Sequence, residues 1–244
     1  MKTTVIFDMD GVISDTQEMQ SVIESNLLKR FGVNISPKEL TKKYAGIRSQ
    51  DFFKQMLDKN KVKYDLEKLM AEKRKLVISK VKTELKEIPG STELIKKLYA
   101  QKYKLAVASS SNRNLVETIL KKLKVRKYFS VIVTGDDVIK SKPHPECYLL
   151  AAKKISSKPK ECIVIEDAKN GMIAGKKAKM FVIGLVSKKS KEYPADVLVT
   201  SHKQIQKLDL SLCSSVVEHL PRKQKVVGST PIRGFKKDNY ANKS

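Results

Sequence analysis

Short apolar runs of strand length alternate with segments of helical pattern along most of this chain. The runs are rich in Val and Ile, and several are apolar on both faces, which is typical of parallel strands covered by helices on both sides. The expected strands are 3–7, 104–108, 130–133, 162–165, 181–185 and 197–199, and the expected helices among them are 92–101, 113–122, 145–154 and 170–178. This repetition predicts an α/β fold with a doubly wound, Rossmann-like parallel sheet.

One long segment after the first strand breaks this rhythm, because it contains no convincing strand. Within it, Ser36–Glu39 is a good helix start, with Ser at the N-cap, Pro at the first helical position and Glu at the third. Apolar residues then recur at helical spacing. We therefore expect residues 1–15 and 86–208 to form the core and residues 16–85 to form an inserted helical cap. A mobile cap would exclude water from a site at the strand ends.

The chain is strongly basic, with 50 Lys and Arg against 26 Asp and Glu and a formal net charge of +24. Such an excess can indicate a nucleic-acid or membrane partner. However, the lysines are spread along the whole chain, aromatic residues make up only 6% of it, and no basic run is paired with stacking residues. We expect solvated helix faces and no nucleic-acid partner, and the positive field would help to recruit an anionic phosphate ester.

No targeting or membrane pattern stands out. The three Cys residues are far apart and odd in number, which fits neither a disulfide framework nor a metal motif. Asp8 and Asp10 interrupt the first hydrophobic run, so it does not read as a signal peptide. No apolar stretch approaches the ~20 residues that a membrane helix needs. We expect a cytoplasmic monomer without membrane contact.

Residues 209–244 match no element that this fold needs. Residues 214–220 and 228–231 can be back-translated into strings that look like the D arm and the T arm of a transfer-RNA gene, in the right order. Our hypothesis is that this tail is a reading frame that runs into an adjacent tRNA gene, and it should then be disordered and without function. A simple disordered basic tail predicts the same structure.

Two acids stand two positions apart at the end of the first expected strand. Asp8 and Asp10 precede Gly11, and ligands bind at the carboxyl ends of strands in open α/β sheets. Two carboxylates in one turn repel each other unless a cation lies between them, and Mg²⁺ is often held by one or two carboxylates plus substrate phosphate. An Asp can also be a nucleophile that forms an aspartyl-phosphate. Taken alone, a helix cap with two surface acids explains this pair equally well.

Three further strand ends carry matching chemistry. Residues 109–112 are Ser-Ser-Ser-Asn, and hydroxyls with backbone N–H groups at a helix N-terminus can bind phosphate, although Ser-rich turns are commonly simple caps. Lys142 lies in the loop after the third strand, and Glu166 and Asp167 follow the fourth. Each signal alone is weak, since a lone Lys is normally solvated and an acid pair is often a cap. Together they supply the nucleophile, phosphate donors, cation and metal ligands that phosphoryl transfer needs.

Four segments together resemble the haloacid dehalogenase-like hydrolases. They are Phe7–Val12, Ala108–Asn112, Ser141–Glu146 and Ile165–Gly171, in this order. More narrowly, they are similar to the branch that contains β-phosphoglucomutase, phosphoglycolate phosphatase and sugar-phosphate phosphatases. The resemblance implies a Mg²⁺-dependent phosphatase that hydrolyses a small phosphate monoester, such as a sugar phosphate, through an aspartyl-phosphate intermediate.

The resemblance also implies catalytic roles. Asp8 would attack phosphorus, and Asp10 would protonate the leaving oxygen and then activate water. Ser109 would bind the transferring phosphoryl oxygens, and Lys142 would stabilise the charge on Asp8 and on the phosphate. An Asp at position 10, rather than Ser or Thr, suits phosphate transfer better than dehalogenation because it can act as a general acid.

The remaining implied residues bind metal and substrate. The metal ligands would be Asp8, Asp10 through its backbone carbonyl, Glu166 and Asp167. The substrate contacts would be Gly11, Ser110, Asn112, Gly46 and Arg48, with Gly46–Arg48 similar to the substrate-specificity loop of the cap. Lys73, Arg74 and Lys75 would either place a cation over the leaving group or form a solvated helix face.

Two alternative functions stand beside the phosphatase. A mutase of the β-phosphoglucomutase type would return the phosphoryl group to a sugar, but Gln20 stands where such mutases usually carry a hinge His, and Arg48 is one place off their cap Arg. Both departures favour the phosphatase. A non-catalytic basic binding protein on the same scaffold would predict loss of at least one of Asp8, Asp10, Lys142 or Asp167, and all four are present.

Overall fold

A six-stranded, fully parallel sheet forms the centre of the protein in this computed structural model, which describes residues 3–210. The strand order is β3-β2-β1-β4-β5-β6. The strands are β1 (Thr4–Phe7), β2 (Lys104–Ala108), β3 (Val131–Val133), β4 (Cys162–Glu166), β5 (Phe181–Leu185) and β6 (Val197–Val199). The predicted doubly wound α/β fold is confirmed, and β1 lies between β2 and β4, where the order of the strands reverses direction.

Helices cover both faces of this sheet because successive strand residues point to opposite sides. Val5 and Phe7 of β1 belong to one apolar core with helices α5 (Ser91–Ala100), α6 (Arg113–Lys122) and α9 (His202–Ile205). Ile6 belongs to a second core, on the other face, with helices α7 (Glu146–Lys154) and α8 (Lys169–Lys177). The strands are buried on both faces, which is why they read as continuous apolar runs in the sequence.

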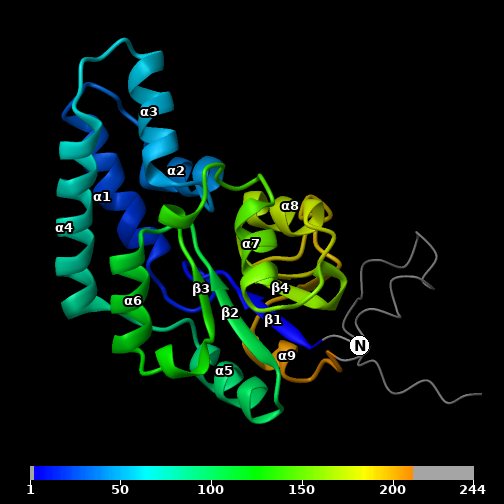
Figure 1. The fold of residues 1–244 in the computed structure, drawn as a ribbon. Coiled ribbons are helices and arrows are strands. Elements are labelled where there is room, and N and C mark those ends of the chain that lie inside the picture. Colours follow the sequence, from blue (N-terminus) through cyan, green and yellow to red (C-terminus); the bar gives the residue numbers. More distant parts are fainter. Residues whose placement is uncertain (1–2, 211–244) are drawn as a thin grey trace, which may run out of the picture.

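The segment between β1 and α5 contains four helices: α1 (Gln17–Lys29), α2 (Pro37–Tyr44), α3 (Ser49–Lys59) and α4 (Leu66–Glu84). Figure 1 shows them as a group beside the sheet, at its upper left. The predicted start of α2 is confirmed, because the Ser36 hydroxyl accepts a hydrogen bond from the Glu39 N–H at 3.2 Å. The bounds given above for the core and the cap stay predictions.

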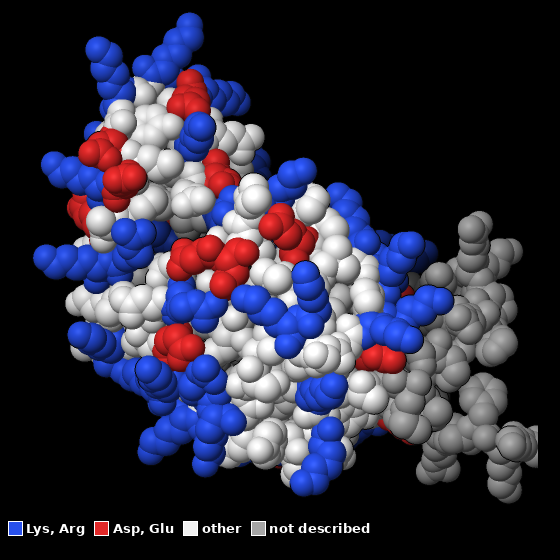
Figure 2. Space-filling model, viewed as in Figure 1, with Lys and Arg blue, Asp and Glu red and all other residues white. Residues whose placement is uncertain are grey.

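Basic side chains are spread over cap and core alike on the face drawn in Figure 2, with acidic side chains between them. No helix within residues 3–210 is both long enough and apolar enough to cross a membrane. The predicted tRNA-derived tail lies outside the described residues, except for Asp209 and Leu210.

Candidate active site

The site is built at the carboxyl ends of β1, β2 and β4, which are neighbours in the sheet. Asp8 directly follows β1 and is buried, and its backbone N–H donates to the Ile165 carbonyl of β4 at 3.0 Å. Ser109 directly follows β2 and is also buried. Glu166 is the last residue of β4. Parallel strands in register therefore deliver three of the predicted site residues to one edge of the sheet.

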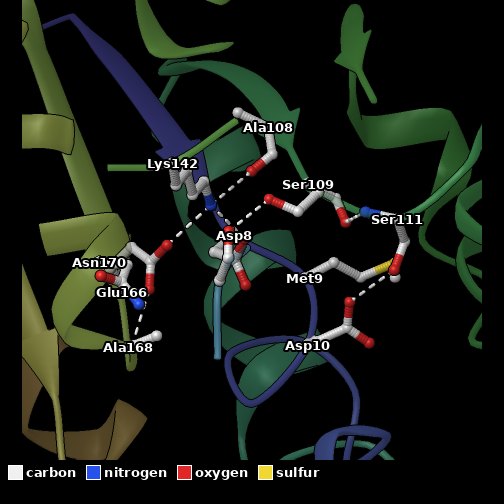
Figure 3. Close-up of polar contacts among 12 residues, drawn as sticks. Asp8, Met9, Asp10, Ala108, Ser109, Ser111, Lys142, Glu166, Ala168 and Asn170 are labelled. Atoms are coloured by element: carbon white, nitrogen blue, oxygen red, sulfur yellow. Dashed lines mark hydrogen bonds and ion pairs between the residues drawn. The ribbon is translucent and has the colours of Figure 1, made fainter. Parts of the chain in front are cut away.

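Lys142 lies at the centre of this edge and is fully buried. Its Nζ donates to Asp8 Oδ1 at 2.6 Å, to Glu166 Oε1 at 2.7 Å and to the Ala108 carbonyl at 3.2 Å. These three acceptors satisfy the three N–H donors of an ammonium. Figure 3 shows the Asp8 and Glu166 carboxylates converging on it from two strands. Lys142 also lies 4.8 Å from the centroid of the Tyr148 ring, whose hydroxyl donates to Glu166 Oε1 at 2.9 Å.

Three carboxylates gather around this single ammonium. Asp8, Glu166 and Asp167 each offer an oxygen within 4.8 Å of the others. Burial raises the pKa of Asp8 to about 8, with Lys142 opposing the shift and Glu166 and Asp10 adding to it. Burial, followed by Glu166 and Asp8, also raises the pKa of Asp167 well above its ordinary value. The cluster therefore holds more negative charge than Lys142 can balance, and these oxygen atoms can hold a hard cation.

Two glycines let the backbone approach these carboxylates closely. A Cβ on Gly11, which has a φ of +81°, would lie 2.1 Å from Asp167 Oδ2. A Cβ on Gly171 in α8 would lie 1.6 Å from Glu166 Oε1. No side chain larger than hydrogen fits at either position without moving the acid beside it.

Asp10 lies in the same loop as Asp8, but its carboxylate makes different contacts. Its Oδ1 accepts hydrogen bonds from the Thr16 hydroxyl and from Gln20 Nε2, the latter at 2.6 Å, and its Oδ2 accepts from the Ser111 hydroxyl at 2.9 Å. Ser111 comes from the loop after β2, whereas Gln20 belongs to cap helix α1. Three hydrogen-bond donors, one of them from the core and one from the cap, thus fix the orientation of this carboxylate.

The structure brings several predicted substrate residues to one cavity between the cap and the sheet. Among its lining residues, the catalytic loops supply Asp8, Asp10, Ser110 and Ser111, and the cap supplies Gly46. The Ser110 hydroxyl donates to the Gly46 carbonyl at 2.5 Å, so the loop after β2 contacts the cap directly. Asn112 is not among these lining residues, because its side chain caps α6 by accepting from the Leu115 N–H at 3.0 Å.

Arg48 lies at the boundary between cap and core and not in the lining of the cavity. Its guanidinium donates to the carbonyls of Gly135 (3.2 Å), Val138 (2.7 Å) and Ile139 (2.6 Å), which follow β3. Its Nε donates to Asp51 at 2.9 Å. The three carbonyl contacts therefore bind the cap to the core, and the Asp51 contact within the cap holds the guanidinium in place.

The three basic residues of α4 have different environments. Lys73 is buried, and its Nζ pairs with Glu24 Oε1 at 2.7 Å. Arg74 and Lys75 are exposed. A solvated helix face therefore describes Arg74 and Lys75, whereas Lys73 points into the cap. Glu24 has no distinctive sequence signal of its own, although Gln17, Gln20, Ser21 and Glu24 recur at helical spacing and form one polar face of α1.

Comparisons with known proteins agree with this geometry. The family model of the haloacid dehalogenase-like hydrolases matches residues 5–185. A phosphorylated carbohydrates phosphatase of Thermotoga maritima is 33% identical over 177 residues, which are 71% of this chain and 80% of the relative. A β-phosphoglucomutase of Bacillus subtilis is 32% identical over 189 residues, which are 74% of this chain and 82% of the relative.

The solved structures agree as well. The crystal structure of a β-phosphoglucomutase from Clostridium difficile superimposes with a TM-score of 0.76 at 26% identity, covering 88% of this chain and 96% of the other. The chain therefore belongs to the haloacid dehalogenase-like hydrolase family, in the branch similar to β-phosphoglucomutase and the sugar phosphatases. It is an enzyme of the phosphoric monoester hydrolase class.

Proposed function

We propose that this protein is a Mg²⁺-dependent phosphatase that hydrolyses a small phosphate monoester, such as a sugar phosphate, through an aspartyl-phosphate on Asp8. The observation that carries the proposal is the buried Asp8–Lys142–Glu166 arrangement, whose Asp8 lines a cavity between cap and core. A buried carboxylate next to a fixed ammonium provides a nucleophile and a positive charge for the phosphoryl group at one point.

The donor set fits Mg²⁺, which prefers carboxylate and carbonyl oxygens. Asp8, Glu166 and Asp167 would hold the ion with their side chains, and Asp10 would hold it with its backbone carbonyl. The raised pKa values of Asp8 and Asp167 support this proposal, since they mark carboxylates whose burial and acidic neighbours disfavour the charged form in the absence of a cation. When bound, Mg²⁺ would balance the negative charge of the carboxylates and of the phosphoryl group.

In the first half-reaction, an oxygen of Asp8 forms a bond to phosphorus while the bond from phosphorus to the leaving oxygen breaks. The leaving oxygen takes a proton from Asp10 and departs as an alcohol. Ser109 would donate to a phosphoryl oxygen, and Lys142, held 2.6 Å from Asp8, stabilises the charge that moves between nucleophile and phosphate.

In the second half-reaction, water attacks phosphorus and gives a proton to Asp10, while the bond between phosphorus and Asp8 breaks. Inorganic phosphate leaves, and both acids return to their starting states. Asp10 lines the same cavity as Asp8, which supports its assignment to both proton transfers.

A β-phosphoglucomutase activity is the second candidate, because relatives and a solved structure of that name are similar to this chain. A mutase that hands the phosphoryl group to a sugar monophosphate must accommodate a second phosphoryl group in the cavity. Water is the better acceptor here, since no Lys or Arg of residues 3–210 lines the cavity on the cap side.

The test compares Asp8→Asn and Asp10→Asn with wild type on p-nitrophenyl phosphate and acetyl phosphate in the presence of Mg²⁺. We expect Asp8→Asn to lose all turnover, and Asp10→Asn to be strongly slowed while it still binds phosphate mimics. Asp15→Asn is the matched control, because Asp15 is an exposed acid of the same loop. Full activity of Asp8→Asn would contradict the proposed nucleophile. Conversion of glucose 1-phosphate, assayed separately, distinguishes the mutase.

A further inference from the structure

The cap side of the cavity is polar but carries no positive charge of its own. The polar cap residues that line it are Gln17, Gln20, Ser21, Glu24, Tyr44 and Ser49. Apolar and aromatic side chains, including Phe52, lie between them. Of the residues in the described part of the chain, no Lys or Arg lines this cavity. A leaving group that enters here therefore meets amides, hydroxyls and one carboxylate.

Lys73 is a buried cap cation that contacts three of these lining residues. Its Nζ pairs with Glu24 Oε1 at 2.7 Å, and both side chains are 8% exposed. The same Nζ donates to Gln20 Oε1 at 3.0 Å and to the Ser49 hydroxyl. Two N–H donors of the ammonium thus make hydrogen bonds, and its charge is paired with Glu24. Glu24 thus neutralises the charge of Lys73. Gln20, Glu24 and Ser49, which line the cavity, separate Lys73 from it.

Arg48 is a second cap cation, and it stands between two lining residues, Ile47 and Ser49, without lining the cavity itself. Its guanidinium is bound to three backbone carbonyls of the core and to Asp51. Neither cation could bind a second anionic group on the substrate without breaking contacts that hold the cap together.

Glu24 lines the cavity, and within residues 3–210 only one of its two carboxylate oxygens has a polar partner. Both of its contacts, to Lys73 and to the Ser49 hydroxyl at 2.9 Å, use Oε1. Among the described residues, Oε2 has no polar partner, although Glu24 lines the cavity. A carboxylate oxygen only accepts hydrogen bonds, so it suits a hydroxyl of the leaving group and repels an anion. A second anionic group on the substrate would lose its hydration in the cavity and would gain no hydrogen-bond donor from Glu24, which is unfavourable.

We propose that Glu24, held by Lys73, is a specificity-determining residue that selects an uncharged, hydroxylated leaving group and rejects substrates with a second anionic group. The substrate class is then the monophosphate of a polyol or neutral sugar, as opposed to a bisphosphate or a phosphorylated carboxylic acid. This inference rests on the proposed phosphatase function and narrows its substrate. Tyr44 and Phe52 would cover the apolar C–H face of such a molecule.

Matched pairs of substrates test the substrate class in the wild-type enzyme. Glucitol 6-phosphate and 6-phosphogluconate have the same carbon skeleton, but the second carries a carboxylate in place of a hydroxymethyl group. Glucose 6-phosphate and glucose 1,6-bisphosphate form a second pair. We expect kcat/KM to favour the uncharged member of each pair by about tenfold or more. Equal or better hydrolysis of the anionic members would overturn the proposal.

The variant Glu24→Gln tests the role of Glu24 itself. It removes the carboxylate and leaves Lys73 with an uncompensated charge, so the preference for the uncharged member of each pair should fall by about tenfold or reverse. Glu72→Gln on α4 is the control, because Glu72 is a cap acid whose side chain is 40% exposed and pairs with Arg30 on the surface. A preference that stays at the wild-type value in Glu24→Gln would remove Glu24 from the proposal.

A second variant covers the case in which Glu24→Gln does not fold. The double variant Glu24→Gln/Lys73→Gln contains no buried unpaired charge, and it should also lose preference for the uncharged substrates. Hydrolysis of p-nitrophenyl phosphate distinguishes a failure of the proposed phosphatase function from a failure of the specificity inference. If no phosphate ester is hydrolysed at all, the proposed function fails. If p-nitrophenyl phosphate is hydrolysed while the anionic members are preferred, only the specificity inference fails.

Discussion

Gln20 joins Asp10, the proposed acid/base residue of the core, to the buried Lys73–Glu24 ion pair of the cap. Its Nε2 donates to Asp10 Oδ1 at 2.6 Å, and its Oε1 accepts from Lys73 Nζ at 3.0 Å. An amide suits this position because it offers a donor to a carboxylate and an acceptor to an ammonium at the same time. The orientation of Asp10 therefore depends on where the cap lies.

Replacement of Gln20 by Leu should slow catalysis without unfolding the protein. The variant keeps the volume of the side chain but removes the hydrogen bond to Asp10. Hydrogen bonds to charged groups contribute about 1.5–3 kcal/mol, so we expect kcat to fall by about tenfold or more with p-nitrophenyl phosphate. Gln55→Leu is the control, since Gln55 is exposed on α3. An unchanged kcat would show that Asp10 does not need this partner.

Removal of the Arg48 side chain should loosen the closed arrangement of cap and core. Arg48→Ala loses three hydrogen bonds to core carbonyls, each worth about 1 kcal/mol or more. We expect KM for a sugar phosphate to rise by about tenfold, because the cap encloses its leaving group. The KM for acetyl phosphate, which has little leaving group to enclose, should change less.

The control for that experiment is Arg74→Ala, which removes an exposed arginine from the same cap. Limited proteolysis gives a second measurement, since an open cap should be cleaved faster between its helices. If KM rises equally for both substrates and proteolysis is unchanged, Arg48 acts on substrate directly, as the sequence predicts, and not through the cap.

The sequence indicates why the core residues of the candidate site lie together, because the spacing of parallel strands determines their placement, while their roles stay predictions. Asp8, Ser109 and Glu166 each lie at the end of an apolar run, and such ends meet at one edge of the sheet. Lys142 was recognisable only through its neighbours, since a single Lys in a basic chain carries little information. The structure distinguishes Lys142 from a solvated lysine, because its side chain is buried and pairs with both Asp8 and Glu166.

The cap half of the site could not be predicted in the same way. Arg48 contacts residues 135–139, and this long-range packing leaves no local pattern in the sequence. The polar stripe of α1 that includes Gln20 and Glu24 has the spacing of an ordinary solvated helix face. That stripe lines a cavity because the cap lies over the strand ends, which the sequence alone does not show.

Gly171→Ala should damage the proposed metal site through Glu166. The added Cβ would lie 1.6 Å from Glu166 Oε1, so the acid must move away from Lys142. Overpacking of this kind typically lowers the free energy of unfolding by about 1–3 kcal/mol. We expect a lower Tm and a higher Mg²⁺ concentration for half-maximal activity. Lys169→Ala, an exposed change in α8, should alter neither value.

The carboxylate cluster also predicts how stability depends on pH and metal. The pKa of Asp8 rises from an ordinary value of 3.8 to about 8 in the folded protein, chiefly because the group is buried. Between these two values the folded state holds a proton that the unfolded chain has released. The contribution of Asp8 to the free energy of unfolding therefore falls as the pH rises through this window.

In EDTA, the Tm of wild type relative to Asp8→Asn should accordingly decrease from about pH 4 to about pH 8, because the variant lacks this titrating group. Mg²⁺ binds the ionised carboxylates, so its stabilising effect should be larger at the alkaline end, and its binding should release protons to the buffer. Calorimetric titration in two buffers of different ionisation enthalpy measures that release. A Tm difference that increases with pH, or Mg²⁺ binding without proton release, would contradict the raised pKa of Asp8. Either result would mean that Asp8 is already ionised before the metal arrives.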